Sequence, residues 1–78
     1  MTLEIISAEK ILFQGEAVAV KLPGELGSFT VLNNHASLIS ALVPGKVEYR
    51  TSDNAVHNID VKGGLVDVDN NVVSVCIY

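Results

Sequence analysis

The sequence predicts an all-β domain, a two-layer β-sandwich or flattened barrel of about eight to ten short, mainly antiparallel strands. Two observations carry this prediction. Apolar residues alternate with polar ones along most of the 78-residue chain, which is typical of half-buried strands. Glycine, proline, asparagine and aspartate interrupt this alternation every few residues, at about the spacing expected of turns in an all-β protein.

We expect nine strands, each bounded by a turn signal. They cover residues 3–7, 11–13, 16–22, 28–32, 38–43, 46–52, 55–61, 64–69 and 72–77. Within the third, Val18, Val20 and Leu22 share one face, and within the sixth, Val47 and Tyr49 point inward. The alternation therefore predicts which side chains form the core.

Two later segments complete the pattern. The last strand places Val73, Val75 and Ile77 on one face. The segment "ASLISALV" is ambiguous, because the spacing of its apolar residues also fits a helix. We nevertheless count residues 38–43 among the expected strands.

The turn signals are of three kinds. Pro23-Gly24 and Pro44-Gly45 suit β-turns, in which proline presets one dihedral angle and glycine takes a positive one. Residues 52–54 and 69–71 suit hairpin tips, because asparagine and aspartate tolerate left-handed geometry. Gly63-Gly64 marks a further break in the chain.

The length predicts one domain, residues 1–78, with a thin core. Yet 49% of the residues are hydrophobic and only 18% are charged. Such a chain either packs nearly every apolar group inside or leaves some on its surface for a partner.

Composition excludes several classes of function. Five basic residues, spread thinly in a chain of net charge −4, argue against nucleic-acid binding. The longest apolar runs fall far short of the roughly 20 residues of a spanning helix, so we expect no direct membrane insertion. The opening residues do not resemble a signal peptide. The single cysteine, Cys76, forms no internal disulfide, and we expect a reduced, cytosolic protein.

Candidate catalytic groups are few. His35 and His57 are the only histidines, and no histidine or cysteine has the close-paired spacing of a zinc site. Ser37 lies too near His35 in sequence to form a nucleophile–base pair. His57 shares parity with Ile59, so we expect it to cap the edge of a buried face. We therefore expect no catalytic residue, no metal and no cofactor.

Other binding classes are weakly supported. The stretch "PGELGSF" lacks the lysine and the strand–loop–helix setting of a phosphate-binding loop. The hairpin "TSDNAV" lacks the lysine of a lipoyl or biotinyl carrier domain. Sparse aromatic residues and negative charge argue against an oligonucleotide-binding barrel. The residues point to a binding or structural module and leave its partner open.

Several short motifs stand out along the chain, and the most specific is "LNNHASLISALVPG". Together they comprise Ser7-Ala8-Glu9, Phe13-Gln14-Gly15-Glu16, Pro23-Gly24, Gly27-Ser28-Phe29, His35-Ala36, Leu38, Ala41-Leu42, Pro44-Gly45, Gly63-Gly64, Val66 and Val68. In this order they resemble the N-terminal β-sandwich of the epsilon subunit of F-type ATP synthases, in which a histidine block is followed by Pro-Gly.

The chain departs from the family pattern at three places. Asn33-Asn34 stands where the family has Pro-Gly, and this pair still suits a turn. Thr30 replaces a glycine, and Ser37 replaces a proline. These departures concern loop geometry and leave the expected fold unchanged.

The resemblance implies a non-catalytic central-stalk subunit that links the gamma subunit to the membrane rotor ring and couples proton translocation to ATP synthesis. It implies a peripheral position at the cytoplasmic face of the cell membrane. The implied gamma-facing residues are Ser7, Asn34, His35, Ala36, Ser37 and Leu38. The implied ring-facing loop is Gly24, Glu25, Leu26, Gly27, Ser28, Phe29 and Thr30.

Family members usually continue into a C-terminal helical hairpin that can obstruct rotation in the hydrolysis direction. Because this sequence ends at Tyr78, on the expected last strand, we expect a subunit that supports coupling without applying that brake. The alternative interpretation is a free-standing small-ligand or carrier-type module that shares only the sandwich.

Overall fold

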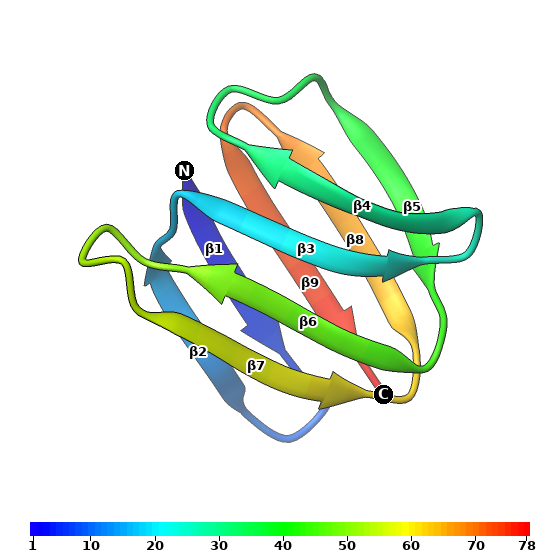
Figure 1. The fold of residues 1–78 in the computed structure, drawn as a ribbon. Coiled ribbons are helices and arrows are strands. Elements are labelled where there is room, and N and C mark those ends of the chain that lie inside the picture. Colours follow the sequence, from blue (N-terminus) through cyan, green and yellow to red (C-terminus); the bar gives the residue numbers. More distant parts are fainter.

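Nine β-strands make up the computed structural model, which describes residues 1–78 (Figure 1). The strands are β1 (Thr2–Ile6), β2 (Ile11–Glu16), β3 (Ala19–Gly24), β4 (Gly27–Leu32), β5 (Leu38–Leu42), β6 (Gly45–Arg50), β7 (Val56–Val61), β8 (Gly64–Asp69) and β9 (Val72–Ile77). The all-β prediction is confirmed. The ambiguous segment forms β5, which pairs with β8 along its whole length. No helix is present that is long and apolar enough to cross a membrane.

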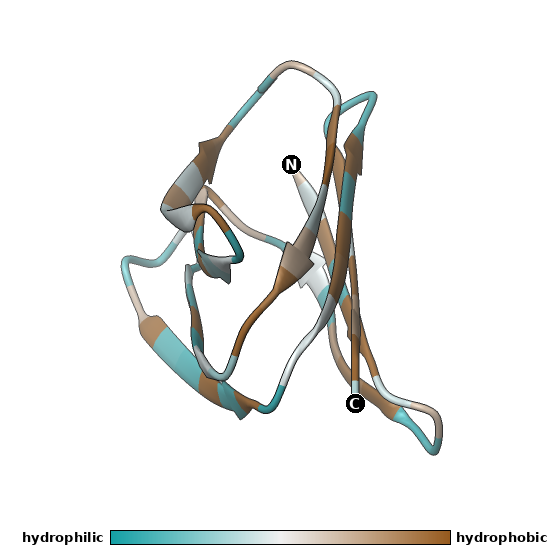
Figure 2. Cartoon of the chain, turned by 90° about the vertical axis from the view of Figure 1, so that its right-hand side faces the viewer, coloured by the Kyte–Doolittle hydropathy of each residue, from teal (hydrophilic) through white to brown (hydrophobic).

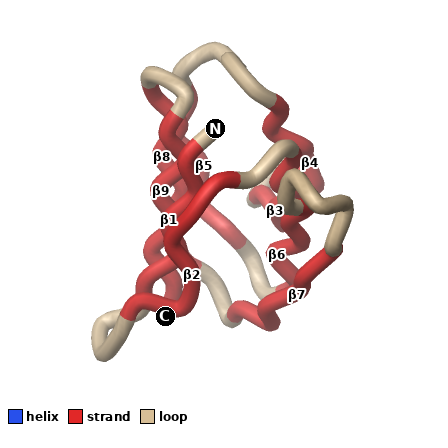
Figure 3. Tube along the Cα trace, turned by 90° about the vertical axis from the view of Figure 1, so that its left-hand side faces the viewer, coloured by secondary structure: helices blue, strands red, loops and turns tan.

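The strands form one sheet that curls into two layers. The first layer has the order β2-β1-β9-β8-β5, and the second has the order β4-β3-β6-β7. Figure 3 shows the two layers facing each other. A single residue pair, Gly24 with Leu42, joins the layers where β3 meets β5. All neighbouring strands are antiparallel except β1 and β9, so the mainly antiparallel sandwich is confirmed.

The core lies between the layers and is made of aliphatic side chains. Sixteen of the 19 buried residues are hydrophobic, and no polar or charged residue is buried. The predicted inward residues of β6 and β9 are buried. Figure 2 shows hydrophobic and hydrophilic residues following one another along much of the chain. Each fully buried leucine, isoleucine or valine contributes about 1.5–3 kcal/mol to stability. Burial of one face of each strand therefore holds the two layers together.

Three rings close the gap between β2 and the second layer. The Phe13 ring lies 4.4 Å, centroid to centroid, from the Tyr49 ring, and Tyr49 stacks at 5.1 Å on His57. His57 is itself exposed, while Ile59 and Val61 on the same face are more buried. It therefore covers the end of a buried face, as its parity predicts. Burial also raises the pKa of the Tyr49 hydroxyl.

The predictions for the two Pro-Gly pairs are wrong in part, because neither Gly24 nor Gly45 has a positive φ and Gly45 begins β6. Pro23 and Gly24 lie within β3, paired with Ser28 and Gly27, and the chain reverses afterwards at residues 25–26. Proline, which has no backbone N–H, is tolerated at this position because only its carbonyl oxygen takes part in a hydrogen bond. That oxygen accepts a 2.9 Å hydrogen bond from the backbone N–H of Val43. The expected strand 16–22 is likewise divided, because β2 runs on to residue 16 and β3 begins at residue 19.

The asparagine-rich turns follow the prediction. Asn70 and Asn71 form the tip between β8 and β9 with φ of 49° and 62°, as a type I′ turn requires at both central positions. Asn54 has a φ of 66° in the hairpin between β6 and β7. Asparagine supplies left-handed geometry here in place of glycine.

Candidate interaction surface

Two corners of the molecule lie at opposite ends of β4. A tight turn, residues 24–27, joins β3 to β4, and a longer loop, residues 33–37, joins β4 to β5 (Figure 1). We call them the turn corner and the loop corner. A six-residue strand separates their ends by about 17 Å, at about 3.4 Å per residue. Nearly all the residues implicated by sequence fall at or beside these two corners.

The turn corner is shaped by glycine. Gly24 and Gly27 pair across the hairpin, and Gly27 has a φ of 126°, which side chains with a Cβ rarely adopt. A Cβ on Gly24 would lie 2.7 Å from the Gly27 carbonyl oxygen and 2.7 Å from the Phe29 ring. The backbone N–H of Glu25 donates a 2.9 Å hydrogen bond to the Ala41 carbonyl. The turn is therefore held tightly against β5.

The side chains of the turn corner divide into two groups. Leu26 is fully exposed at the tip, with a relative exposure of 102%, and Glu25, Ser28 and Thr30 are also exposed. Phe29 is half-buried and packs against the core. Leu26 and Glu25 therefore carry what this corner offers a partner, while Phe29 supports the turn from within.

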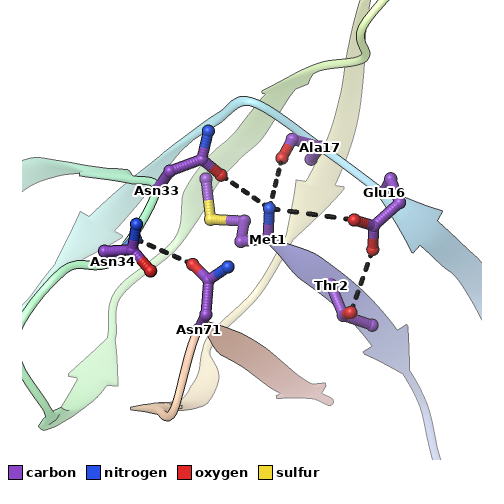
Figure 4. A network of polar contacts seen from close by, with 7 residues as sticks. All are labelled: Met1, Thr2, Glu16, Ala17, Asn33, Asn34 and Asn71. Atoms are coloured by element: carbon purple, nitrogen blue, oxygen red, sulfur yellow. Dashed lines mark hydrogen bonds and ion pairs between the residues drawn. The ribbon is translucent and has the colours of Figure 1, made fainter.

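The loop corner is held by polar contacts from distant parts of the chain (Figure 4). The Met1 ammonium donates hydrogen bonds to the Ala17 carbonyl at 3.1 Å and to Asn33 Oδ1 at 2.6 Å. It also lies 4.0 Å from the Glu16 carboxylate. These contacts join the start of β1 to the start of the loop.

Two further contacts join the loop to β8 and β9. The backbone N–H of Asn34 donates a 2.8 Å hydrogen bond to Asn71 Oδ1. The Ser37 hydroxyl donates a 2.6 Å hydrogen bond to an Asp69 carboxylate oxygen. Asn34 has a φ of 61°, so it adopts the left-handed geometry that glycine provides at this place in the resembled pattern.

His35 stands exposed in the middle of the loop corner. Its backbone N–H donates to the Leu32 carbonyl at 3.2 Å. Its ring Nδ1 lies 2.7 Å from the Ala36 carbonyl oxygen, and since a carbonyl only accepts, Nδ1 carries the proton. Nε2 is then the ring nitrogen available to a partner. Because the Ser37 hydroxyl bonds Asp69 instead of the ring, the two residues form no nucleophile–base pair.

The structure does not gather all of the implicated residues. Ser7 follows the far end of β1, where its backbone N–H bonds the Lys10 carbonyl at 2.9 Å, whereas the loop corner contacts the start of that strand. Leu38 is half-buried and packs against the core. Asn34, His35, Ala36 and Ser37 are exposed together. The loop corner is thus a four-residue patch, with Ser7 apart from it and Leu38 beneath it.

Sequence reasoning missed one exposed apolar residue between the corners. Ile39 is 74% exposed on β5. Ile39 borders a shallow hollow that is lined by the tip of the turn corner, the start of β4 and the start of β5. The lining residues are Leu26, Gly27, Ser28, Phe29, Leu38, Ile39 and Ser40. The signal was present in the alternation, because inward Leu38 and Leu42 leave Ile39 facing outward.

Comparison with known proteins decides the family. Residues 1–77 match the model of the ATP synthase delta/epsilon chain β-sandwich domain. The chain belongs to this family. The family resemblance stated from the sequence motifs is therefore confirmed.

Curated relatives in the delta/epsilon family are longer than this chain. The ATP synthase epsilon chain of Sulfurimonas denitrificans is 38% identical over 77 residues, covering 99% of this chain and 59% of the relative. The epsilon chain of Bordetella petrii is 40% identical over 75 residues, covering 96% of this chain and 53% of the relative. The chain thus spans somewhat more than half the length of these relatives.

Solved structures share the fold at lower identity. A chain in the cryo-EM structure of the Euglena gracilis mitochondrial ATP synthase (OSCP/F1/c-ring) superimposes with a TM-score of 0.91 at 21% identity. That match covers 96% of this chain and 48% of the other. A chain of the Tetrahymena thermophila mitochondrial ATP synthase central stalk and c-ring gives a TM-score of 0.84 at 16% identity.

Proposed function

We propose that this chain is a non-catalytic central-stalk subunit of an F-type ATP synthase. In this role it links the gamma subunit to the membrane rotor ring and couples ion translocation to ATP synthesis. Its place is peripheral, at the cytoplasmic face of the cell membrane, and residues 1–78 act as a single domain. Membership of the delta/epsilon family supports this proposal.

One structural observation carries the proposal. The two exposed corners lie at opposite ends of one strand, about 17 Å apart, and each is held rigidly by its own contacts. A subunit that transmits torque needs two separate contact sites on a stiff body. A loosely held loop would absorb rotation instead of passing it on.

The loop corner is the proposed gamma contact. His35 presents ring Nε2, and Ala36 and Ser37 present a small, exposed surface beside it. Ile39 adds an exposed apolar side chain on the adjacent strand. Together they offer a hydrogen-bond acceptor next to an aliphatic contact, which is the mixture found in specific protein interfaces. Ser7 and Leu38, also implicated by resemblance, are less suited because one lies apart and the other faces inward.

The turn corner is the proposed contact with the rotor ring. Leu26 projects fully into solvent at the tip, and Glu25 adds a negative charge beside it. Gly27 is exposed, and no atom lies within 4 Å of an added Cβ there, so the backbone of a partner loop can approach it closely.

Site-directed crosslinking in assembled membranes tests both assignments. With Cys76 replaced by serine, single cysteines are introduced at Leu26, His35 and Asn54, all of which are exposed. We expect Leu26→Cys to crosslink to ring-loop cysteines and His35→Cys to crosslink to gamma. Asn54→Cys, at the tip of another hairpin, is the control and gives neither product.

Three outcomes would overturn the proposal. Ring crosslinks from Asn54→Cys alone would reverse the orientation of the subunit. Failure of the wild-type chain to co-purify with gamma would remove the stalk function. Binding of a small ligand by the isolated chain, without gamma binding, would favour a free-standing module.

A further inference from the structure

The loop corner is held at both of its ends by one tight turn. The backbone N–H of Asn34 donates a 2.8 Å hydrogen bond to Asn71 Oδ1. At the other end of the loop, the Ser37 hydroxyl donates a 2.6 Å hydrogen bond to Asp69 Oδ1. Both acceptors belong to residues 69–71, which we call the β8–β9 turn and which lie 37 and 32 residues further along the chain. The two residues between these hydrogen bonds are therefore fixed from both sides.

Asn71 takes part in these contacts through its backbone as well as its side chain. Its carbonyl oxygen accepts a 3.0 Å hydrogen bond from the backbone N–H of Thr2. The ammonium of Met1 in turn donates to Asn33 Oδ1, beside the contact between Asn34 and Asn71 (Figure 4). Because consecutive residues make these contacts on each side, they form a closed ring of β1, the loop corner and the β8–β9 turn. Removing the Asn71 side chain opens this ring and leaves the backbone contact in place.

The turn itself does not require the amide of Asn71. Asn70 and Asn71 have φ of 49° and 62°, the geometry of a type I′ turn. Glycine adopts this geometry without strain, so the backbone alone could make the turn. The Asn71 amide is the group that reaches the loop, whereas that of Asn70 takes no part in the contact. Asparagine at position 71 therefore serves the loop more than the turn.

The course of the loop backbone decides where the His35 ring lies. Residues 33–37 are all exposed, so hydrogen bonds and not packing fix their course. His35 Nδ1 lies 2.7 Å from the Ala36 carbonyl oxygen, a contact that depends on the backbone between the two ends of the loop. Ordering a free loop on binding opposes association, so a loop that is ordered beforehand binds more tightly.

We propose that Asn71 and Asp69 are positioning residues for the loop corner. They hold it in the form in which His35 meets a partner, and they act through the loop without touching that partner. The inference rests on the proposed function for the identity of the partner, which is the gamma subunit. The order of the loop can be measured in the free chain, without gamma.

The first test uses two variants of one residue in the free chain. Asn71→Gly removes the acceptor and keeps the positive φ, while Asn71→Asp keeps both. We expect Asn71→Gly to speed amide hydrogen exchange at Asn34 about tenfold or more. By NMR, its His35 ring should change from the Nδ1-protonated form to a mixture of tautomers. Asn71→Asp should leave the exchange rate within about threefold and the ring unchanged.

The second test is the affinity for gamma. We expect binding about tenfold weaker for Asn71→Gly and within about twofold of wild type for Asn71→Asp. Asn70→Asp places the same charge in the same turn. Asn54→Ala lowers stability through its φ of 66° in the hairpin between β6 and β7. Both controls should bind within about twofold of wild type, so that neither charge nor instability explains the loss.

The Asp69 end of the loop should contribute less. Ser37 is followed by Leu38, which begins β5 and packs against the core, so this end has a second anchor. We expect Asp69→Ala to weaken gamma binding about threefold. Asp69→Asn keeps an acceptor oxygen and should restore the wild-type affinity.

Three results would overturn the positioning role. Equal loss of affinity in Asn71→Asp and Asn71→Gly would show that the amide NH2 group contacts gamma directly. An equal loss in Asn54→Ala would show that stability alone matters. Unchanged Asn34 exchange in Asn71→Gly would show that the loop is ordered without the turn. If the wild-type chain fails to bind gamma, the proposed function falls, and the exchange and ring measurements still decide whether the β8–β9 turn orders the loop.

Discussion

The two corners at the ends of β4 are both exposed, yet they are held in place by different kinds of contact. The turn corner is held by close packing around Gly24 and by the backbone geometry of Gly27. The loop corner is held by hydrogen bonds from Asn33, Asn34 and Ser37 to distant parts of the chain. A contact surface can therefore be held in place by close packing or by hydrogen bonds. The turn corner and the loop corner should accordingly respond differently to substitution.

The largest expected effect is at the turn corner. Gly24→Ala places a Cβ 2.7 Å from both the Gly27 carbonyl oxygen and the Phe29 ring. Because the backbone oxygen cannot rotate away, we expect a loss of about 3 kcal/mol in the free energy of unfolding. Urea denaturation followed by tyrosine fluorescence measures it. A Gly24→Ala, Phe29→Leu double variant should lose less than the sum of the single losses, and simple additivity would contradict a steric cause.

A smaller loss is expected from strain alone in the same turn. An added Cβ on Gly27 meets nothing within 4 Å, but its φ of 126° is unfavourable for alanine. We expect Gly27→Ala to cost about 2 kcal/mol, measured in the same way. Loss of stability equal to that of Gly24→Ala would show that crowding is not what distinguishes the two glycines.

The loop corner should respond less, and through its hydrogen bonds. Asn71→Ala removes the acceptor of the Asn34 N–H and also places alanine at a φ of 62°. We expect it to cost about 1.5–2 kcal/mol. Asn70→Ala, at a φ of 49° in the same turn, keeps that hydrogen bond and should cost about 0.5–1 kcal/mol. Equal costs would mean that the hydrogen bond contributes nothing to holding the loop.

The smallest effects on stability are expected for the exposed side chains of the turn corner and the loop corner. Leu26→Ser and His35→Ala replace exposed side chains, so each should change the free energy of unfolding by less than about 0.5 kcal/mol. Under the proposed function, each should nevertheless weaken one partner contact. His35→Ala should reduce gamma binding and leave ring crosslinking intact, and Leu26→Ser should do the reverse. Loss of both contacts from either variant would argue against two separate sites.

The strands and the core could be predicted from sequence because both depend on a local signal. Alternation places Val47, Tyr49 and Val73 inward whatever the strand order. Turns with asparagine at positive φ could be predicted for the same reason. Pro23-Gly24 could not, because the same dipeptide suits either a turn or the end of a strand. The pairing of β3 with β4 and the carbonyl contact to Val43 decide between them.

The candidate site was less predictable because its contacts join residues far apart in sequence. Asn33 contacts the Met1 ammonium, and Asn34 contacts Asn71, and neither contact has a local pattern. The separation of Ser7 from His35 follows from the direction of β1 in the sheet.

The parallel pairing of β1 with β9 has a consequence for how the molecule is assembled in time. Thr2 lies opposite Val72, so the first and last strands must meet before the first layer is complete. Closing a loop that long is entropically costly and makes folding slow relative to proteins built from local contacts. During synthesis, the β1–β2 hairpin would wait on the ribosome with its inner face uncovered until residues 72–77 emerged. Residues 1–78 would thus reach their native fold only after β9 had left the ribosome.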